Sequence, residues 1–412
     1  MILFSSINLL SFRKWKMILW SLFIVVFAGC EKAYFGNPDP VESLLFLRIE
    51  EMDAGADIHC ISGEDLLIAG SQRRAASPAS GAEANDLVIA RVTSSGLVKW
   101  TQVMELGLDH RAVRVKSLSG GAVVVLGMVS DTNALGQIHQ DITVSLINEA
   151  GTLFWQTQVG GPGNQIGHDI EQTADRGFII TGSNDANGMV MDEEGNRARD
   201  VWLLKLNALG DSLWSESLGY QGDDFANDVE ELTDGSLLIL GTTRQSLAGQ
   251  ADDNFFLIKT NSMGKGPVNR ILGGMEKENG LEIIVVNDGF FLAGNITYNT
   301  HSSILLYRFG FDIYSTMIFQ KEYAVGESSV MVGLEPYGEK LFLTGSSGNT
   351  SEENIFLMQL GRDGENLRTW QWGADSRQET LAMDLFSDSE LFILFNNQFV
   401  NGSVLGLLTL FL

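Results

Sequence analysis

A unit of about fifty residues repeats along this chain, and the repeat restricts the fold more than any other feature of the sequence. One unit contains four strand-like segments, namely Val201–Leu206, a stretch around Trp214, Asn227–Leu232 and Ser236–Gly241. Such segments are apolar throughout or alternate between apolar and polar residues, as β-strands do. The 45 glycines and 6 prolines fit many short strands joined by tight turns.

Several residue types recur at the same place in successive units. A small polar residue opens one strand at Asp86, Asp141, Asp200, Asn254, Ser303, Asn354 and Ser403. A glycine ends the following turn at Gly96, Gly151, Gly210, Gly264 and Gly364. Glycine is expected there because a tight hairpin with a bulge needs a residue at positive φ. A tryptophan column at Trp100, Trp155 and Trp214 predicts packing between units, although sugars also stack on exposed indoles.

The two chain ends indicate how the units stack. One four-stranded sheet of this size cannot bury both faces, so neighbouring units must cover each other. The last unit stops at Leu412, and the strand that it lacks appears at the other terminus as Leu44–Ile49. A repeat divided between both termini predicts a closed ring without open sheet edges. The sequence therefore predicts an all-β, seven-bladed β-propeller whose last blade is closed by the N-terminal strand.

The order of the strands resembles that of kelch-type propellers, with a glycine-closed second strand and a tryptophan-bearing outer strand. The segment Asn207–Trp214 is also similar to the repeats of quinoprotein-like propellers. Together the repeats resemble those of secreted propellers and propeller lipoproteins of Bacteroidetes-type bacteria, over nearly the whole mature chain. The resemblance implies the blade structure of the fold, but it does not imply a particular activity. The quinoprotein-like lipoproteins suggest one further role, a scaffold for outer-membrane protein assembly.

The N-terminus has the features of a processing signal. The basic residues Arg13, Lys14 and Lys16 precede the apolar run Met17–Gly29, which is too short to span a bilayer but suits a signal peptide. The small residues before Cys30 resemble the bacterial lipobox, in which the cysteine is lipidated. An ordinary secretory signal, with Cys30 incidental, is the alternative.

These patterns divide the chain into a signal peptide at 1–29, a lipidated tether at 30–42 and the propeller at 43–412. We expect an outer-membrane lipoprotein of the bacterial cell envelope, held to the membrane by its N-terminal lipid and monomeric. The periplasmic and the surface side both remain open. Cys60, the one other cysteine, lies in an alternating strand pattern and is expected to be a core residue without a disulfide partner.

The charge balance excludes one class of partner. Lys and Arg number 27 against 52 Asp and Glu, a formal net charge of −25. A surface this acidic repels phosphate backbones, so we expect no nucleic-acid binding. Long segments such as Ser71–Asn85 and Thr242–Asp253 gather on one face of the predicted ring, and loops on a rigid scaffold commonly bind ligands. We therefore expect a protein or glycan ligand at this loop-rich face, over the central channel.

Candidate metal ligands surround one of these loops. They are Asp185, Asp192, Glu193, Glu194 and Asp200. Carboxylates at this density suit Ca²⁺, which makes calcium the one cofactor that the sequence suggests. Their spacing lacks the alternate-residue ligands of a calcium loop, so a solvated acidic loop is favoured and no cofactor is required.

Candidate acid–base residues lie at the starts of the predicted inner strands. His110 and His168, paired across adjacent blades, would face the channel, with Asp169 and Asp228 nearby. Asp57, Asp169 and Asp228 recur at matching places, and such a column favours a structural role, in which each carboxylate ties an inner strand to backbone N–H groups of its neighbour.

Common enzyme motifs are absent, since the sequence contains no G-x-S-x-G, no H-E-x-x-H and no P-loop. We therefore favour a non-enzymatic binding module over the alternative, an extracytoplasmic polysaccharide hydrolase or lyase with a site at the channel mouth.

Overall fold

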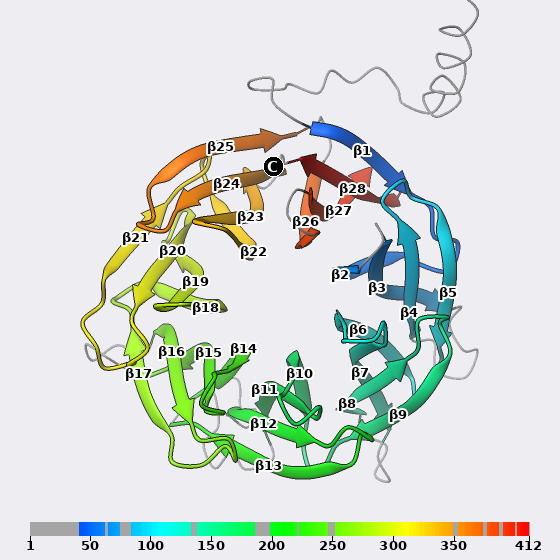
Figure 1. Cartoon of the computed structure of the whole chain (residues 1–412), viewed down its shortest axis with the longest axis horizontal. Helices are drawn as coiled ribbons and strands as arrows, with labels where there is room; N and C mark the ends of the chain where they lie inside the picture. The colour runs from blue at the N-terminus through cyan, green and yellow to red at the C-terminus, as the bar shows by residue number, and fades with distance from the viewer. Residues whose placement is uncertain are drawn as a thin grey trace, which may run out of the picture.

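The protein is a ring of antiparallel sheets. The computed structural model describes residues 41–61, 65–74, 84–132, 138–185, 198–220, 222–245, 252–348, 353–373, 377–386, 390–399 and 402–411. Within these ranges 28 strands form seven four-stranded sheets arranged around a central axis (Figure 1). The predicted seven-bladed all-β propeller is confirmed. No helix in the described ranges is long and apolar enough to cross a membrane.

Every blade uses its strands in the same order, from the channel outward. The innermost strands are β2 (Ala54–Ile61), β6 (Asp109–Ser117), β10 (Gln165–Gln172), β14 (Asp224–Glu231), β18 (Lys277–Val286), β22 (Ser329–Tyr337) and β26 (Arg377–Phe386). The second strands are β3 (Asp65–Arg74), β7 (Val123–Thr132), β11 (Phe178–Asn184), β15 (Leu237–Arg244), β19 (Gly289–Thr297), β23 (Lys340–Gly348) and β27 (Glu390–Phe399). The third strands are β4 (Ala84–Thr93), β8 (Ile138–Ile147), β12 (Asp200–Leu206), β16 (Asp253–Thr260), β20 (Ser302–Phe309), β24 (Glu353–Gly361) and β28 (Gly402–Phe411). The outermost strands are β5 (Val98–Met104), β9 (Leu153–Val159), β13 (Ser212–Leu218), β17 (Val268–Leu272), β21 (Phe319–Tyr323), β25 (Asn366–Trp372) and β1 (Val41–Leu47).

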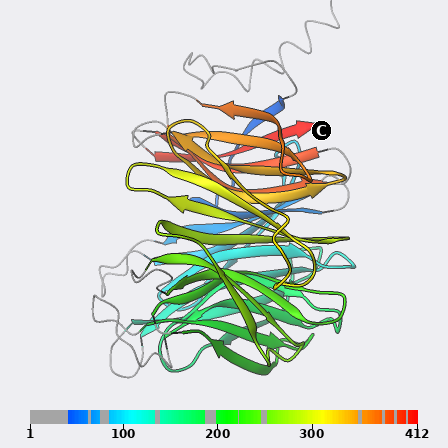
Figure 2. The same ribbon diagram turned by 90° about the vertical axis from the view of Figure 1, so that its left-hand side faces the viewer.

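The N-terminal strand closes the ring, as predicted. β1 pairs with β28 from Val41↔Leu410 to Leu47↔Leu405, in the sheet order β1-β28-β27-β26. Figure 2 shows the ring edge-on, with β1 beside the C-terminal strand. The strand begins at Val41 and ends at Leu47, a little earlier than the predicted Leu44–Ile49. Its alternation explains the register, because Leu47 is buried while Phe46 is 51% exposed.

The second and third strands of each blade carry the core. They are nearly continuous apolar segments, buried on both faces because each blade is covered by a neighbour on either side. The tryptophan column lies in these interfaces, where each indole covers the hairpin glycine of the next blade. The pairs are Trp100 with Gly151, Trp155 with Gly210 and Trp214 with Gly264. A methyl group on Gly210 would lie 2.8 Å from the Trp155 ring, and its φ of 84° also favours glycine. The column therefore packs between blades, as predicted.

Candidate functional site in the central channel

A β-bulge at the same place in every inner strand determines which side chains line the channel. Each of the seven inner strands shifts register against its second strand near its middle. The first ring of side chains after the bulge is Asp57, Arg114, Asp169, Asp228, Glu282, Gly333 and Ala382. The second ring, two residues further along each strand, is His59, Lys116, Glu171, Glu230, Ile284, Glu335 and Asp384.

Both rings border one cavity of about 820 Å³. Eight of its lining residues are carboxylic acids, against one arginine, one lysine and two histidines. The lining extends to Ser117, Ser119 and Pro336, at the carboxyl ends of the inner strands. The long connections from which we predicted a binding face follow the second strands, such as β3, and begin beside the opposite ends of the inner strands. The described cavity therefore lies in the other half of the channel, and most of those connections lie outside the described residues.

Three first-ring carboxyl groups tie neighbouring blades together. The Oδ2 atom of Asp57 accepts a hydrogen bond of 2.8 Å from the N–H of Val115. In the same way, the Oδ2 atom of Asp228 accepts one of 2.6 Å from Ile283. Glu282 accepts one of 2.6 Å from the N–H of Leu334. The predicted structural role is confirmed for Asp57 and Asp228.

Asp169, in the same column, forms ion pairs instead. Its Oδ1 atom lies 3.1 Å from the Nζ of Lys116 and 3.7 Å from the Nε of Arg114. Burial alone would raise the pKa of Asp169, but the charges of Lys116 and Arg114 outweigh burial and hold the pKa below its usual value. Lys116 also contacts Glu171. Asp169 is therefore a charged member of a buried network.

The carboxyl groups on β14, β18 and β22 have higher pKa values than Asp169, so they are protonated more readily. Burial, together with the charge of Glu171, raises the pKa of Glu230 to about 8. Burial also raises the pKa of Glu282 to about 7. The pKa values of Asp228 and Glu335 lie well above their usual range, because burial and like charges both disfavour ionisation. Glu230 and Glu282 therefore hold protons near neutral pH.

His59, on β2, joins its own blade to the neighbouring blade on either side. Its Nδ1 lies 3.0 Å from the Oδ2 of Asp384 on β26, and its Nε2 lies 2.9 Å from the Oγ of Ser117 on β6. The side chain of His59 is 29% exposed and that of Asp384 is 14% exposed. Burial lowers the pKa of His59, but the hydrogen bond and charge of Asp384 outweigh burial, so the pKa lies above its usual value.

The predicted pair of channel histidines is wrong. His110 is fully buried, with its Nδ1 3.0 Å from the O of Met104 and its Nε2 2.8 Å from the Oγ1 of Thr143. It precedes the bulge of β6, so it lies between strands and Arg114 takes the channel position. His168 does line the cavity, at the bulge of β10, where its Nδ1 contacts the O of Ala226 at 2.7 Å.

Only two of the five predicted calcium ligands, Asp185 and Asp200, lie in the described ranges. Asp192, Glu193 and Glu194 lie outside the described ranges. Asp185 accepts hydrogen bonds of 2.6 and 2.7 Å from the backbone N–H and the side-chain amide of Asn164. Asp200 begins β12, and burial raises its pKa. No group of three His, Cys, Asp or Glu side chains within the described ranges could hold a metal ion, so calcium stays a prediction.

His59, Ser117 and Asp384 were not among the predicted site residues. A signal for two of them exists in the sequence, because His59 lies two residues after Asp57 in the repeat, and Asp384 occupies the same column in the last blade. Comparing that second column across the repeats would have placed both in the channel. Nothing comparable marks Ser117, whose neighbour Lys116 occupies the column.

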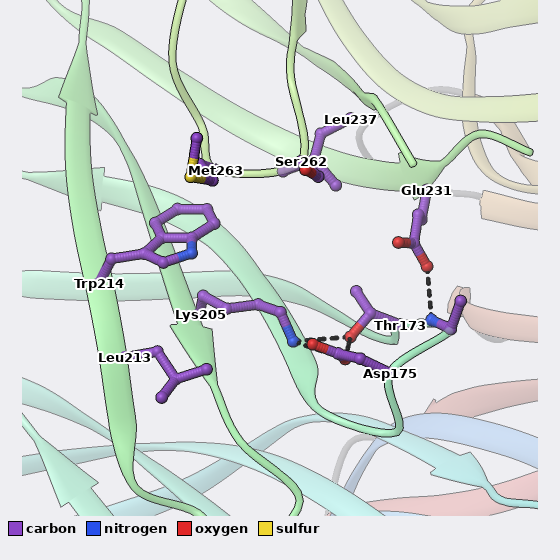
Figure 3. A pocket seen from close by; sticks show the side chains of 10 residues that line it. Thr173, Asp175, Lys205, Leu213, Trp214, Glu231, Leu237, Ser262 and Met263 are labelled. Carbon is purple, nitrogen blue, oxygen red and sulfur yellow. Dashed lines mark hydrogen bonds and ion pairs between the residues drawn. The ribbon is translucent and has the colours of Figure 1, made fainter. Parts of the chain in front are cut away.

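A second cavity, of about 350 Å³, lies between the blades of β10–β13 and β14–β17 (Figure 3). At its centre the Nζ of Lys205 donates to the Oγ1 of Thr173, the Oδ1 of Asp175 and the O of Leu206, at 2.8, 2.9 and 3.2 Å. These bonds use all three ammonium donors. On its wall, Trp214 is the indole that packs on Gly264. The bonds of Lys205 thus lie within one blade, whereas the Trp214–Gly264 contact and a 2.6 Å hydrogen bond from the N–H of Ala174 to Glu231 join the two blades.

The sequence matches no protein-family model and no curated protein. The structure is similar to an ulvan lyase of a new polysaccharide lyase family, with a TM-score of 0.53 and 8% identity over 91% of this chain and 94% of that chain. A structure of such a lyase bound to -[GlcA(1-4)Rha3S]- gives a TM-score of 0.52 and 8% identity over 87% and 92%. A protein of unknown function from Dyadobacter fermentans covers 90% of this chain and 98% of its own at 10% identity, with a TM-score of 0.49. At these identities the similarity shows the β-propeller fold alone.

Proposed function

We propose that this protein is an envelope-anchored binding module that takes a neutral or cationic ligand, a glycan or a protein segment, into its central channel. The observation that carries the proposal is the 820 Å³ cavity, which is bordered by side chains of all seven inner strands. Strands hold these side chains in place, so little conformational entropy is lost when a ligand binds. Small residues at Gly333 and Ala382 leave room in the first ring.

The charge of the cavity restricts the ligand. Its carboxyl groups outnumber its basic groups, and the whole chain carries a net charge of −25. An anionic ligand would be repelled at a distance by the net charge of the chain, and inside the channel the cations Arg114 and Lys116 already pair with Asp169. A cation, in contrast, would replace protons on groups such as Glu230, whose pKa is raised to about 8. Binding of a cationic ligand therefore releases protons.

This charge also bears on the alternative of a polysaccharide lyase or hydrolase. The bound polymer of the similar lyase contains glucuronate and carries negative charge. The acidic channel of the present protein disfavours such a polymer, so we do not extend the substrate of that lyase to this protein. An acid–base site built from His110, His168, Asp169 and Asp228 is also not favoured, because His110 is buried away from the channel.

Anchoring through lipid on Cys30 belongs to the same proposal, and Cys30 lies outside the described residues. Cys30→Ala is expected to abolish incorporation of radiolabelled palmitate and to release the protein from membranes. Unchanged labelling would overturn the anchoring. A role as a scaffold for outer-membrane protein assembly stays a prediction without a specific structural observation in its favour.

A plug in the channel tests ligand binding. A Cβ atom at Gly333 would meet its nearest neighbour, in Met383, at 3.4 Å, so the backbone accepts a side chain there. Gly333→Phe is expected to abolish binding of neutral and cationic members of a panel of oligosaccharides and peptides, measured by titration calorimetry. Sulfated and uronate oligosaccharides are expected not to bind to either protein.

Val330→Phe is the matched control, because Val330 lies on the same strand, is 44% exposed and does not line the cavity. It should bind like the wild type. Binding that survives Gly333→Phe would place the ligand elsewhere, for example at the loop-rich face, and would overturn the channel as the site.

A further inference from the structure

We infer that Asp384, His59 and Ser117 form a nucleophilic triad, and that the channel hydrolyses small carboxylic esters of neutral or cationic alcohols. The inference rests on the proposed entry of a ligand into the channel, but not on the lipid anchor. Its first support is geometric: both contacts needed in such a triad are present, at 3.0 Å between Asp384 and His59 and 2.9 Å between His59 and Ser117.

The carboxylate fixes the tautomer of the histidine. With Asp384 beside it, the Nδ1 atom carries the proton and donates to the carboxylate, which leaves the Nε2 atom as an acceptor for the Ser117 hydroxyl. Asp384 is itself held in place, because its Oδ2 accepts a 2.6 Å bond from the N–H of Cys60. Asp384, which orients the histidine base, is thus itself fixed by a backbone hydrogen bond.

The nucleophile faces the space in which a substrate would lie. Ser117 and His59 both border the cavity, and Ser117 is only partly buried. The turn after it contains the N–H groups of Ser119 and Gly120, which make no hydrogen bond to another backbone group in the described part of the chain. Such amides are the groups that stabilise the oxyanion in acyl transfer.

The reaction needs only the ester and water. Ser117 Oγ attacks the carbonyl carbon while His59 Nε2 takes the hydroxyl proton. The tetrahedral intermediate then expels the alcohol oxygen, which receives that proton, and an acyl-serine remains. Water, deprotonated by His59, attacks the acyl group in a second step, and the proton returns to the serine oxygen as the carboxylic acid leaves.

The surrounding charges select the substrate. The triad itself contains the Asp384 carboxylate, and the whole chain carries a net charge of −25, so an ester that carries negative charge would be repelled. A neutral acyl group on a neutral or basic alcohol meets no such barrier. The neutral probe p-nitrophenyl acetate is therefore expected to react at least about tenfold faster than p-nitrophenyl hemisuccinate.

Covalent labelling tests the triad in the full-length protein. A neutral alkyl fluorophosphonate should phosphonylate Ser117 with loss of fluoride, and peptide mass spectrometry locates the adduct. Ser117→Ala should abolish labelling and esterase activity. His59→Gln and Asp384→Asn should slow both by about 10²–10⁴-fold. Because both side chains also join blades, circular dichroism should show that each variant is still folded at the assay temperature.

Ser95→Ala is the matched control, because Ser95 is an exposed serine that does not line the cavity, and this variant is expected to keep full reactivity. No adduct on Ser117 of the wild-type protein would overturn the inference, as would an equal loss in Ser95→Ala. This readout needs no natural ligand, so it is separate from the binding test. Labelling of Ser117 with unchanged ligand binding in Gly333→Phe would refute the proposed binding site and leave the triad intact.

The pH dependence gives a second readout that a structural role would not affect. His59 must be neutral to accept a proton, and its pKa lies above the usual value because burial is outweighed by Asp384 and Asp57, with Lys116 opposing them. Glu171 also faces it across the channel. The esterase rate should rise with pH through an apparent pKa above about 6.5, and this step should move to lower pH in Asp384→Asn.

Discussion

The two sides of the channel have the same backbone but different chemistry. On β26, β2, β6 and β10, acidic and basic side chains alternate, and we call this the paired side. Its charged members are Asp384, Asp57, His59, Arg114, Lys116, Asp169 and Glu171. On β14, β18 and β22 the channel residues that ionise are all carboxylic acids, and we call this the acidic side. Its members are Asp228, Glu230, Glu282 and Glu335.

The difference shows in two residues of one column. Asp169 and Asp228 occupy the same place in adjacent blades, yet the pKa of Asp169 is lowered and that of Asp228 is raised. Burial raises both, but only Asp169 lies beside Lys116 and Arg114 closely enough to outweigh it. The fold thus fixes where a channel side chain lies, and its neighbours decide whether it is charged. Three experiments with substituted proteins test this contrast.

The largest effect is expected on the paired side. Lys116→Met leaves Asp169 and Glu171 buried without their shared cation, and breaking a buried ion pair in this way costs about 3 kcal/mol of unfolding free energy. Denaturant unfolding at pH 7 measures it. Lys340→Met, at an exposed position, is the control and should stay within about 0.5 kcal/mol of the wild type. Equal stability of the two variants would show that the network contributes nothing.

The acidic side should make stability depend on pH. The pKa of Glu230 is about 8 in the fold, against 4.5 as its ordinary value. Because the folded pKa is raised, this group's contribution is complete below the ordinary value and is lost as pH rises through about 8. Glu230→Gln mimics the protonated acid, so it should stabilise the protein by about 2 kcal/mol at pH 9 and leave it unchanged at pH 4.

Thermal unfolding at both pH values measures this difference. Glu327→Gln, the same change at an exposed position, should have no effect at either pH. A Glu230→Gln protein that is destabilised at pH 9 would mean that the carboxylate form is the one that the fold requires.

The sequence predicts the scaffold well and the chemistry poorly, for a physical reason. Recurrent residues such as Asp57 and Trp155 do the same task in each blade, so repetition alone reveals it. His110 was misplaced because the bulge after Ala112 changes the alternation of β6. A Gly or Ala precedes the bulge in five of the seven inner strands, but Met331 and Thr380 take its place in the other two, so the signal is incomplete. His59 and Asp384 lie at opposite ends of the chain, and only ring closure brings them within 3.0 Å. Such contacts depend on blade geometry, which composition and spacing do not contain.

The smallest effect should come from the acidic side of the shared column. Asp228→Asn keeps an acceptor for the N–H of Ile283, and burial and like charges already disfavour the ionised form of the wild-type side chain by raising its pKa, so stability at pH 7 should change by less than about 0.5 kcal/mol. Asp169→Asn removes the negative charge that pairs with Lys116, and this loss should lower the free energy of unfolding by about 2 kcal/mol. Chemical unfolding of both variants gives the comparison directly. If Asp228→Asn proves as costly as Asp169→Asn, then Asp228 is ionised in the fold, and the two sides of the channel do not differ in protonation.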